Sequence, residues 1–267
     1  MQNPSSSPII KTIAKIGFIA KGLIYSLIGI LGFMAAFELG REAGKDVDKE
    51  RAFNFIEHLP GGKWLLAIVA FGLFCYVLWR LTQAFLLPGN DDSKIKNITK
   101  KIRYFLSGLV YLSLAVFAAK MVFQNQDDSG SQQQVIENLM QTKNGPLLIG
   151  LAAVIIAVVG IYQIFYSFSG KYKKHVSLSS VDPKSRDLLL LSGKIGYAAR
   201  GVVWLIIGWL FSKAAWSAKA SEAGDTAKAF RFLESTNYGS YLLGAVGLGL
   251  LCYGIFNFIR ARYETFE

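Results

Sequence analysis

The chain is organised around residues 194–208, KIGYAARGVVWLIIG, in which a basic start leads into a long apolar run. Two earlier segments have the same pattern: residues 15–29 read KIGFIAKGLIYSLIG, and residues 101–115 read KIRYFLSGLVYLSLA. Recurrence at a regular interval is the signature of a chain built from copies of one supersecondary unit. The sequence therefore predicts a single membrane domain over residues 1–267, with three tandem repeats at residues 13–87, 98–168 and 191–263.

Apolar residues make up 52% of the chain, and they collect in six runs separated by charged segments. Runs of about 20 apolar residues are long enough to cross the hydrocarbon core as helices. All prolines lie outside these runs or at their edges, as expected for helices that satisfy their own backbone hydrogen bonds in lipid. The predicted fold is therefore an all-α polytopic membrane protein, with three helical hairpins in a pseudo-threefold arrangement about the membrane normal. The predicted spans are residues 22–37, 64–85, 104–123, 147–168, 197–211 and 241–259.

The distribution of charge predicts the topology. Of the 29 basic residues, 18 lie on the side of the N-terminus with only 6 acidic residues, whereas the other side has 11 basic and 12 acidic residues. Basic residues near span ends are retained in the cytoplasm, so both termini are predicted to be cytoplasmic. Because the net charge of +11 arises from this asymmetry, we expect no nucleic-acid partner. The first run recurs twice downstream, so we expect a retained span and not a cleaved signal peptide.

The apolar runs lack the groups that coupled transport or catalysis would need. A transporter driven by protons or cations usually has an ionisable group near the bilayer midplane, but long segments contain no carboxylate. The chain also has no glycine-rich phosphate loop and no pair of histidines at coordinating spacing. Cys75 and Cys252 occupy matching repeat positions among apolar neighbours, where we expect packing and no metal or cofactor. The carboxylate-free segments lie between Glu57 and Asp91, Asp92 and Asp127, Glu137 and Asp182, and Glu234 and Glu264.

A polar layer recurs toward the predicted cytoplasmic face. Lys21, Ser107 and Arg200 share one repeat position. A second repeat position contains Arg80, Gln163 and Asn257, and aromatic residues lie close to both positions. The favoured interpretation is a set of snorkelling basic anchors with an aromatic belt at the membrane surface. The predicted belt consists of Tyr25, Trp79, Tyr111, Tyr162 and Trp204.

The alternative interpretation of this layer is a site for a lipid headgroup or phosphate between the helices. Fixed basic groups without a carboxylate to neutralise them would favour anionic lipid. The candidate residues for such a site are Lys21, Arg80, Arg200 and Arg260.

Small residues and amphipathic segments complete the pattern. Glycines and alanines at helical spacing in the spans indicate close helix packing, and a backbone-lined permeation path is the alternative. Short amphipathic segments precede the second span of each repeat, and we expect them to lie in the outer interface as caps. The alternative for these segments is a docking surface for a membrane or periplasmic protein partner. They cover residues 51–59, 135–140 and 227–234.

The repeated openings, together with the matching segments LFCY (73–76) and LLCY (250–253), resemble a bacterial membrane family called domain of unknown function 1206. The resemblance covers residues 13–262 as three tandem two-helix repeats. The middle repeat departs from the pattern, with Arg103 in place of glycine and Ser107 in place of the basic residue. The family has no established activity, so the resemblance implies a fold and a bacterial origin but no mechanism.

These observations lead to a ranked expectation of function. We expect a non-enzymatic integral protein of the bacterial inner (cell) membrane, acting as a scaffold or lipid-interacting component. A small uncoupled channel or transporter is the second candidate, and a lipid-modifying enzyme is the third. Membrane lipids are the expected partners, and the sequence leaves the oligomeric state open.

Overall fold

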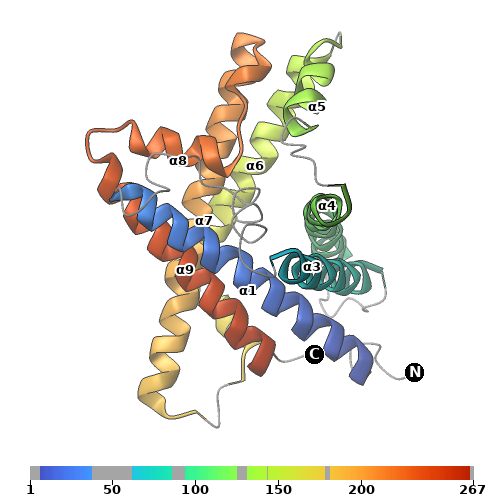
Figure 1. Cartoon of the computed structure of the whole chain (residues 1–267), viewed down its shortest axis with the longest axis vertical. Helices are drawn as coiled ribbons and strands as arrows, with labels where there is room; N and C mark the ends of the chain where they lie inside the picture. Colours follow the sequence, from blue (N-terminus) through green and yellow to red (C-terminus); the bar gives the residue numbers. More distant parts are fainter. Residues whose placement is uncertain are drawn as a thin grey trace.

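The computed structural model describes residues 7–37, 62–85, 94–124, 131–142, 144–177 and 181–264 (Figure 1). Within these residues, six helices are long and apolar enough to cross a membrane, as the sequence predicts. The chain is therefore a multi-pass membrane protein. The six helices are α1 (Pro8–Ala36), α3 (Gly62–Phe85), α4 (Lys94–Gln124), α6 (Gly145–Phe168), α7 (Pro183–Ser217) and α9 (Gly239–Tyr263).

The helices pack in the order expected for three tandem hairpins. Helix α1 packs against α3 of its own repeat and α9 of the third repeat, and α7 packs against α9 and α6. Helix α4 packs against α3, and Figure 1 shows these two helices side by side. Each first helix thus contacts the second helix of the preceding repeat, which is the pattern of a pseudo-threefold ring. The ring is open at one place, because α4 and α6 make no extended contact in the described residues.

Glycines allow the first and third hairpins to close. A Cβ atom added to Gly17 would lie 2.6 Å from the Cα of Tyr76, and one added to Gly196 would lie 2.5 Å from the Cα of Tyr253. The two glycines occupy the same repeat position, and so do the two tyrosines. Helix association in lipid depends on this kind of close backbone approach, so the first and third hairpins are held by the same contact.

The middle repeat has large residues where the other two have glycine. Arg103 stands at the position of Gly17 and Gly196, and Ile155 stands at the position of Gly72 and Gly249. Gly72 and Gly249 each pack directly against an alanine of the partner helix in their hairpins. A side chain as large as isoleucine prevents an equally close approach at that position, which accounts for the separation of α4 and α6 in the described residues.

Three helices begin ten or more residues before the predicted spans. Helix α1 begins at Pro8, α4 begins at Lys94, and α7 begins at Pro183, so parts of the segments predicted as polar linkers are helical. The start of α7 is fixed by Asp182, whose carboxylate accepts a hydrogen bond of 3.2 Å from the backbone N–H of Ser185. Helix α7 has 35 residues and is roughly 52 Å long. Because the hydrocarbon core is about 30 Å thick, part of α7 lies outside it.

Two short helices lie at one end of the bundle. In Figure 1, α5 (Ser131–Met140) and α8 (Thr226–Glu234) lie toward the top, away from the two chain ends at the lower right. Phe230 on α8 is buried, and it contacts the position of Gly32 on α1, as expected for a cap. At the opposite end, the backbone N–H of Ser177 donates a 3.0 Å hydrogen bond to the carbonyl of Tyr263. The predicted segment at residues 51–59 lies outside the described residues.

The outer surface of the bundle is apolar. On α6, for example, Leu147, Val154 and Phe168 are 74%, 60% and 69% exposed. Contiguous apolar surface of this extent is rare on soluble proteins, and a lipid environment accounts for it.

Candidate functional site

Lys21 is a buried cation inside the helix bundle. It is only 2% exposed, and it lies 13 residues after the start of α1, about 20 Å along the helix. Its Nζ donates a 3.2 Å hydrogen bond to the hydroxyl of Tyr76 on α3. The same atom lies 4.8 Å from the ring centroid of Tyr76 and 5.1 Å from those of Tyr111 and Tyr253. The ammonium group is therefore held among three aromatic faces, each of which attracts a cation.

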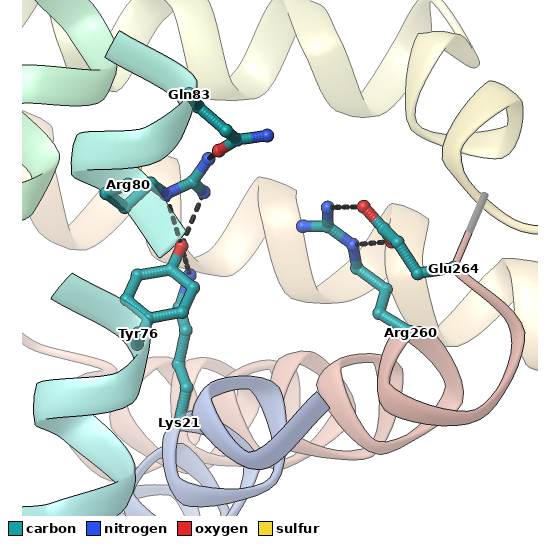
Figure 2. Close-up of polar contacts among 6 residues, drawn as sticks. All are labelled: Lys21, Tyr76, Arg80, Gln83, Arg260 and Glu264. Atoms are coloured by element: carbon teal, nitrogen blue, oxygen red, sulfur yellow. Dashed lines mark hydrogen bonds and ion pairs between the residues drawn. The ribbon is translucent and has the colours of Figure 1, made fainter. Parts of the chain in front are cut away.

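Arg80 shares the same phenol oxygen. It lies one helical turn after Tyr76, and its Nε donates a 2.8 Å hydrogen bond to the Tyr76 hydroxyl, as Figure 2 shows. A terminal nitrogen of its guanidinium donates to Oε1 of Gln83 at 2.6 Å. One phenol oxygen thus accepts hydrogen bonds from two basic side chains, Lys21 and Arg80. These hydrogen bonds hold the two basic groups close to one point.

Arg200 joins this group from α7. Its guanidinium donates a 2.5 Å hydrogen bond to the Tyr253 hydroxyl, and its central carbon lies 5.3 Å from the ring centroid of Tyr25. Its Nε is buried without a hydrogen-bond partner in the described part of the chain. The hydroxyls of Tyr25 and Tyr111 lie 3.3 Å apart. We call the whole group the basic–tyrosine cluster, which comprises Lys21, Arg80, Arg200, Tyr25, Tyr76, Tyr111 and Tyr253.

The helices that form the cluster carry almost no negative charge. Helices α1, α3, α4, α6 and α9 contain no Asp or Glu, and the one carboxylate on α7, Asp187, is exposed. Buried charges are costly unless they are paired. The cluster is therefore chemically suited to an anion with several acceptor oxygens, such as a phosphate.

Arg260 is separate from the cluster. Figure 2 shows its guanidinium paired with the carboxylate of Glu264, to which Nε donates at 2.6 Å. Its central carbon lies 4.3 Å from the ring centroid of Phe18. The sequence groups Arg260 with Lys21, Arg80 and Arg200 as an anionic-lipid candidate, but Glu264 neutralises its charge. The structure thus brings the other three residues together and leaves Arg260 out.

Three of the five residues predicted to form an aromatic belt point into the protein. Tyr25, Trp79 and Tyr111 are only 5%, 3% and 3% exposed, so the belt prediction is wrong for them. Their helices pack these faces against neighbouring helices, which the sequence pattern of one span does not reveal. Tyr162 is 40% exposed, and Trp204 is half-buried with its ring centroid 6.0 Å from the central guanidinium carbon of Arg200.

Sequence reasoning missed two features. Tyr76 and Tyr253 were not predicted as site residues, although they share a repeat position one helical turn before Arg80 and Asn257. Exposed aromatic residues at the opposite end of the bundle were also missed, and they are placed as a belt would be. They are Trp64, Trp216, Tyr238 and Tyr241.

The remaining polar residues of the layer add acceptors. Asn257 donates from its amide nitrogen to the Tyr253 carbonyl at 2.7 Å. Its amide oxygen, and that of Gln163 on α6, are buried without hydrogen-bond partners among the described residues. These two positions correspond to Arg80 in the first repeat, so the basic donors come from the first and third repeats.

Comparisons with known proteins agree with the repeat pattern. A family model described as Domain of Unknown Function (DUF1206) matches residues 16–86, 102–170 and 195–264, which confirms the three tandem repeats. The chain is 26% identical over 259 residues to the uncharacterized protein YxxB of Bacillus subtilis (strain 168). That match covers 97% of this chain and 93% of the relative. No solved structure matches the chain.

Proposed function

This chain belongs to the DUF1206 family, and we propose that it is a non-enzymatic membrane protein that binds the phosphate of an anionic phospholipid. The observation that carries the proposal is the convergence of Lys21, Arg80 and Arg200 on tyrosine hydroxyls, on helices almost free of carboxylates. Arg200 keeps a buried Nε without a hydrogen-bond partner in the described part of the chain. An anionic ligand would accept from it, and the headgroups of the surrounding bilayer supply such a ligand at high local concentration.

The proposed orientation puts the cluster at headgroup depth in the cytoplasmic leaflet. We place both termini in the cytoplasm and the protein in the bacterial inner (cell) membrane, because of the excess of basic residues on that side. Arg80 lies five residues before the end of α3, which is about 8 Å along the helix. That end of α3 faces the cytoplasm in this orientation, so a headgroup phosphate reaches the cluster without crossing the bilayer.

The chemistry of the cluster supports binding and not catalysis. Lys21 and Arg80 are held by the hydroxyl of Tyr76, and neither has a neighbouring carboxylate on its own helix to accept a proton. An array of lysine, arginine and tyrosine hydrogen-bond donors holds a phosphate in place, which favours binding. We therefore propose a lipid-binding or scaffolding role.

The test is lipid retention by a charge-matched pair of double variants. Lys21→Gln/Arg200→Gln removes two cluster cations, and Lys15→Gln/Lys194→Gln removes two exposed cations from the same two helices. Each charge-assisted hydrogen bond is worth about 1.5–3 kcal/mol. We therefore expect the cluster variant to retain anionic phospholipid at least about tenfold less than the native protein, by mass spectrometry of the purified proteins.

A second readout covers the case in which the cluster variant folds poorly. Added anionic phospholipid should raise the melting temperature of the native protein and of the Lys15→Gln/Lys194→Gln control, because a ligand that binds only the folded state stabilises it. Phosphatidylcholine should not. The proposal is abandoned if both double variants retain the same amount of anionic lipid, or if the two lipids stabilise the native protein equally.

A further inference from the structure

The middle repeat differs from its two neighbours in what it leaves exposed. Val110 on α4 is 40% exposed, although the residues at the same repeat position, Ile24 and Val203, are 1% and 5% exposed. On α6, Val159 is 37% exposed, whereas its counterparts Tyr76 and Tyr253 are almost fully buried. At these two positions, the faces of α4 and α6 that would close a third hairpin are therefore apolar and exposed.

The sequence itself opens this hairpin. Ile155, which is 48% exposed, occupies the position at which the other repeats have the closely packed Gly72 and Gly249. Val159 occupies the position at which the other repeats have a tyrosine of the cluster. At these two positions, isoleucine and valine take the place of the glycine and tyrosine that join the two helices of the other hairpins. Such aliphatic side chains are suited to contact with hydrocarbon.

This opening borders the basic–tyrosine cluster on both sides. Val110 directly precedes Tyr111, whose ring lies against Lys21. On the other side, a Cβ atom added to Gly201 would lie 3.0 Å from the carbonyl oxygen of Gly160. Arg200 and Val159 are the sequence neighbours of these two glycines, so each lies within about 1.5 Å of that contact along its helix axis.

We infer that an acyl chain of the bound phospholipid enters the bundle between α4 and α6, along Val110, Val159 and Ile155. The inference rests on the proposed function, because the phosphate at the cluster fixes where the chain begins. Ile155 lies one helical turn, about 6 Å, from Val159 toward the outer end of α6. A chain that leaves the cluster toward the bilayer centre therefore passes Val159 first and Ile155 second.

The experiment uses the full-length protein in lipid nanodiscs with a phosphatidic acid that carries a photoreactive diazirine on one acyl chain. After irradiation, adducts are mapped by mass spectrometry. We expect adducts at Val110, Ile155 and Val159 that excess unlabelled phosphatidic acid displaces and phosphatidylcholine does not. Val154 is exposed, as are its counterparts Phe71 and Leu248 in the other two repeats. Adducts at Val154 should respond equally to both lipids, because they report bulk lipid.

Two substitutions on adjacent positions of α6 provide the matched comparison. Ile155→Trp fills the opening, and Val154→Trp places the same side chain on the lipid-facing surface of the helix. We expect Ile155→Trp to reduce the displaceable adducts about tenfold, the factor that about 1.4 kcal/mol produces, and Val154→Trp to leave them unchanged.

The outcomes separate the inference from the function on which it rests. If anionic lipid is retained through Lys21 and Arg200 but the displaceable adducts map to other helices, the inference is overturned and lipid binding stands. If the cluster variant retains as much anionic lipid as its control, both are overturned. Equal loss of displaceable adducts in the two tryptophan variants would also overturn the inference.

Discussion

The close approach of α7 and α9 gives a quantitative prediction for the variant Gly196→Ala. The added Cβ atom would lie 2.5 Å from the Cα and 2.6 Å from the backbone nitrogen of Tyr253. Carbon atoms are in favourable contact at about 3.5–4.0 Å, so the two helices must separate by roughly 1 Å. Backbone atoms cannot rotate out of the way, as a flexible side chain could.

The net cost follows from two opposing effects. Overpacking of this kind costs about 1–3 kcal/mol, and we take the upper end because the clash is with backbone. Alanine recovers about 1 kcal/mol through its higher helix propensity. The net destabilisation is therefore about 2 kcal/mol, which corresponds to a fall of roughly 4–8 °C in melting temperature for a chain of this size.

The assay is thermal unfolding in detergent, followed by the loss of the monodisperse peak in size-exclusion chromatography. The control is Gly150→Ala on α6, because the nearest atom to its added Cβ is the Cβ of Ala215 at 3.6 Å, an ordinary contact. That variant should melt at the native temperature or slightly above it. A Gly196→Ala protein as stable as Gly150→Ala would refute the close packing of α7 against α9.

Further predictions concern the outer end of the bundle. Asp225→Ala should lower stability by about 1 kcal/mol, because the Asp225 carboxylate caps α8 by accepting from the backbone N–H of Lys228 at 3.2 Å, and Asp225→Asn should restore most of the loss in melting temperature. Phe230→Ala should cost about 3–5 kcal/mol, because this ring is buried, whereas Phe232→Ala, at a half-exposed position, should cost clearly less in the same melting assay. The hydrogen bond from Lys213 lowers the pKa of Glu222, so its small stabilising contribution is present at neutral pH and disappears as the pH falls through that lowered pKa. The difference in melting temperature between the native protein and Glu222→Gln should therefore shrink on acidification, and a difference that grows would contradict this assignment.

Much of the candidate site was within reach of sequence reasoning. Lys21 and Arg200 share a repeat position, and Arg80 falls in the same predicted layer. The apolar spans in or next to which these three residues lie contain no carboxylate. The sequence could not show whether these side chains point into the bundle or toward the membrane surface. A lysine in an apolar run could equally snorkel to the membrane surface, and only the packing of α1 against α3 and α9 shows that Lys21 is 2% exposed.

The sequence by itself determined the number of helices, their apolar character and the threefold repetition, because periodicity and hydropathy are local properties of the chain. Tertiary structure decided which polar groups meet. The separation of Arg260 from the cluster depends on its pairing with Glu264, and the role of Tyr76 depends on side chains from α1 and α3 converging on one oxygen. Tertiary structure also decided where the ring stays open. Ile155 is visible in the sequence, but the effect of its size appears only when Gly72 and Gly249 of the other two repeats are seen in contact with a neighbouring helix, since close packing is a property of two surfaces together.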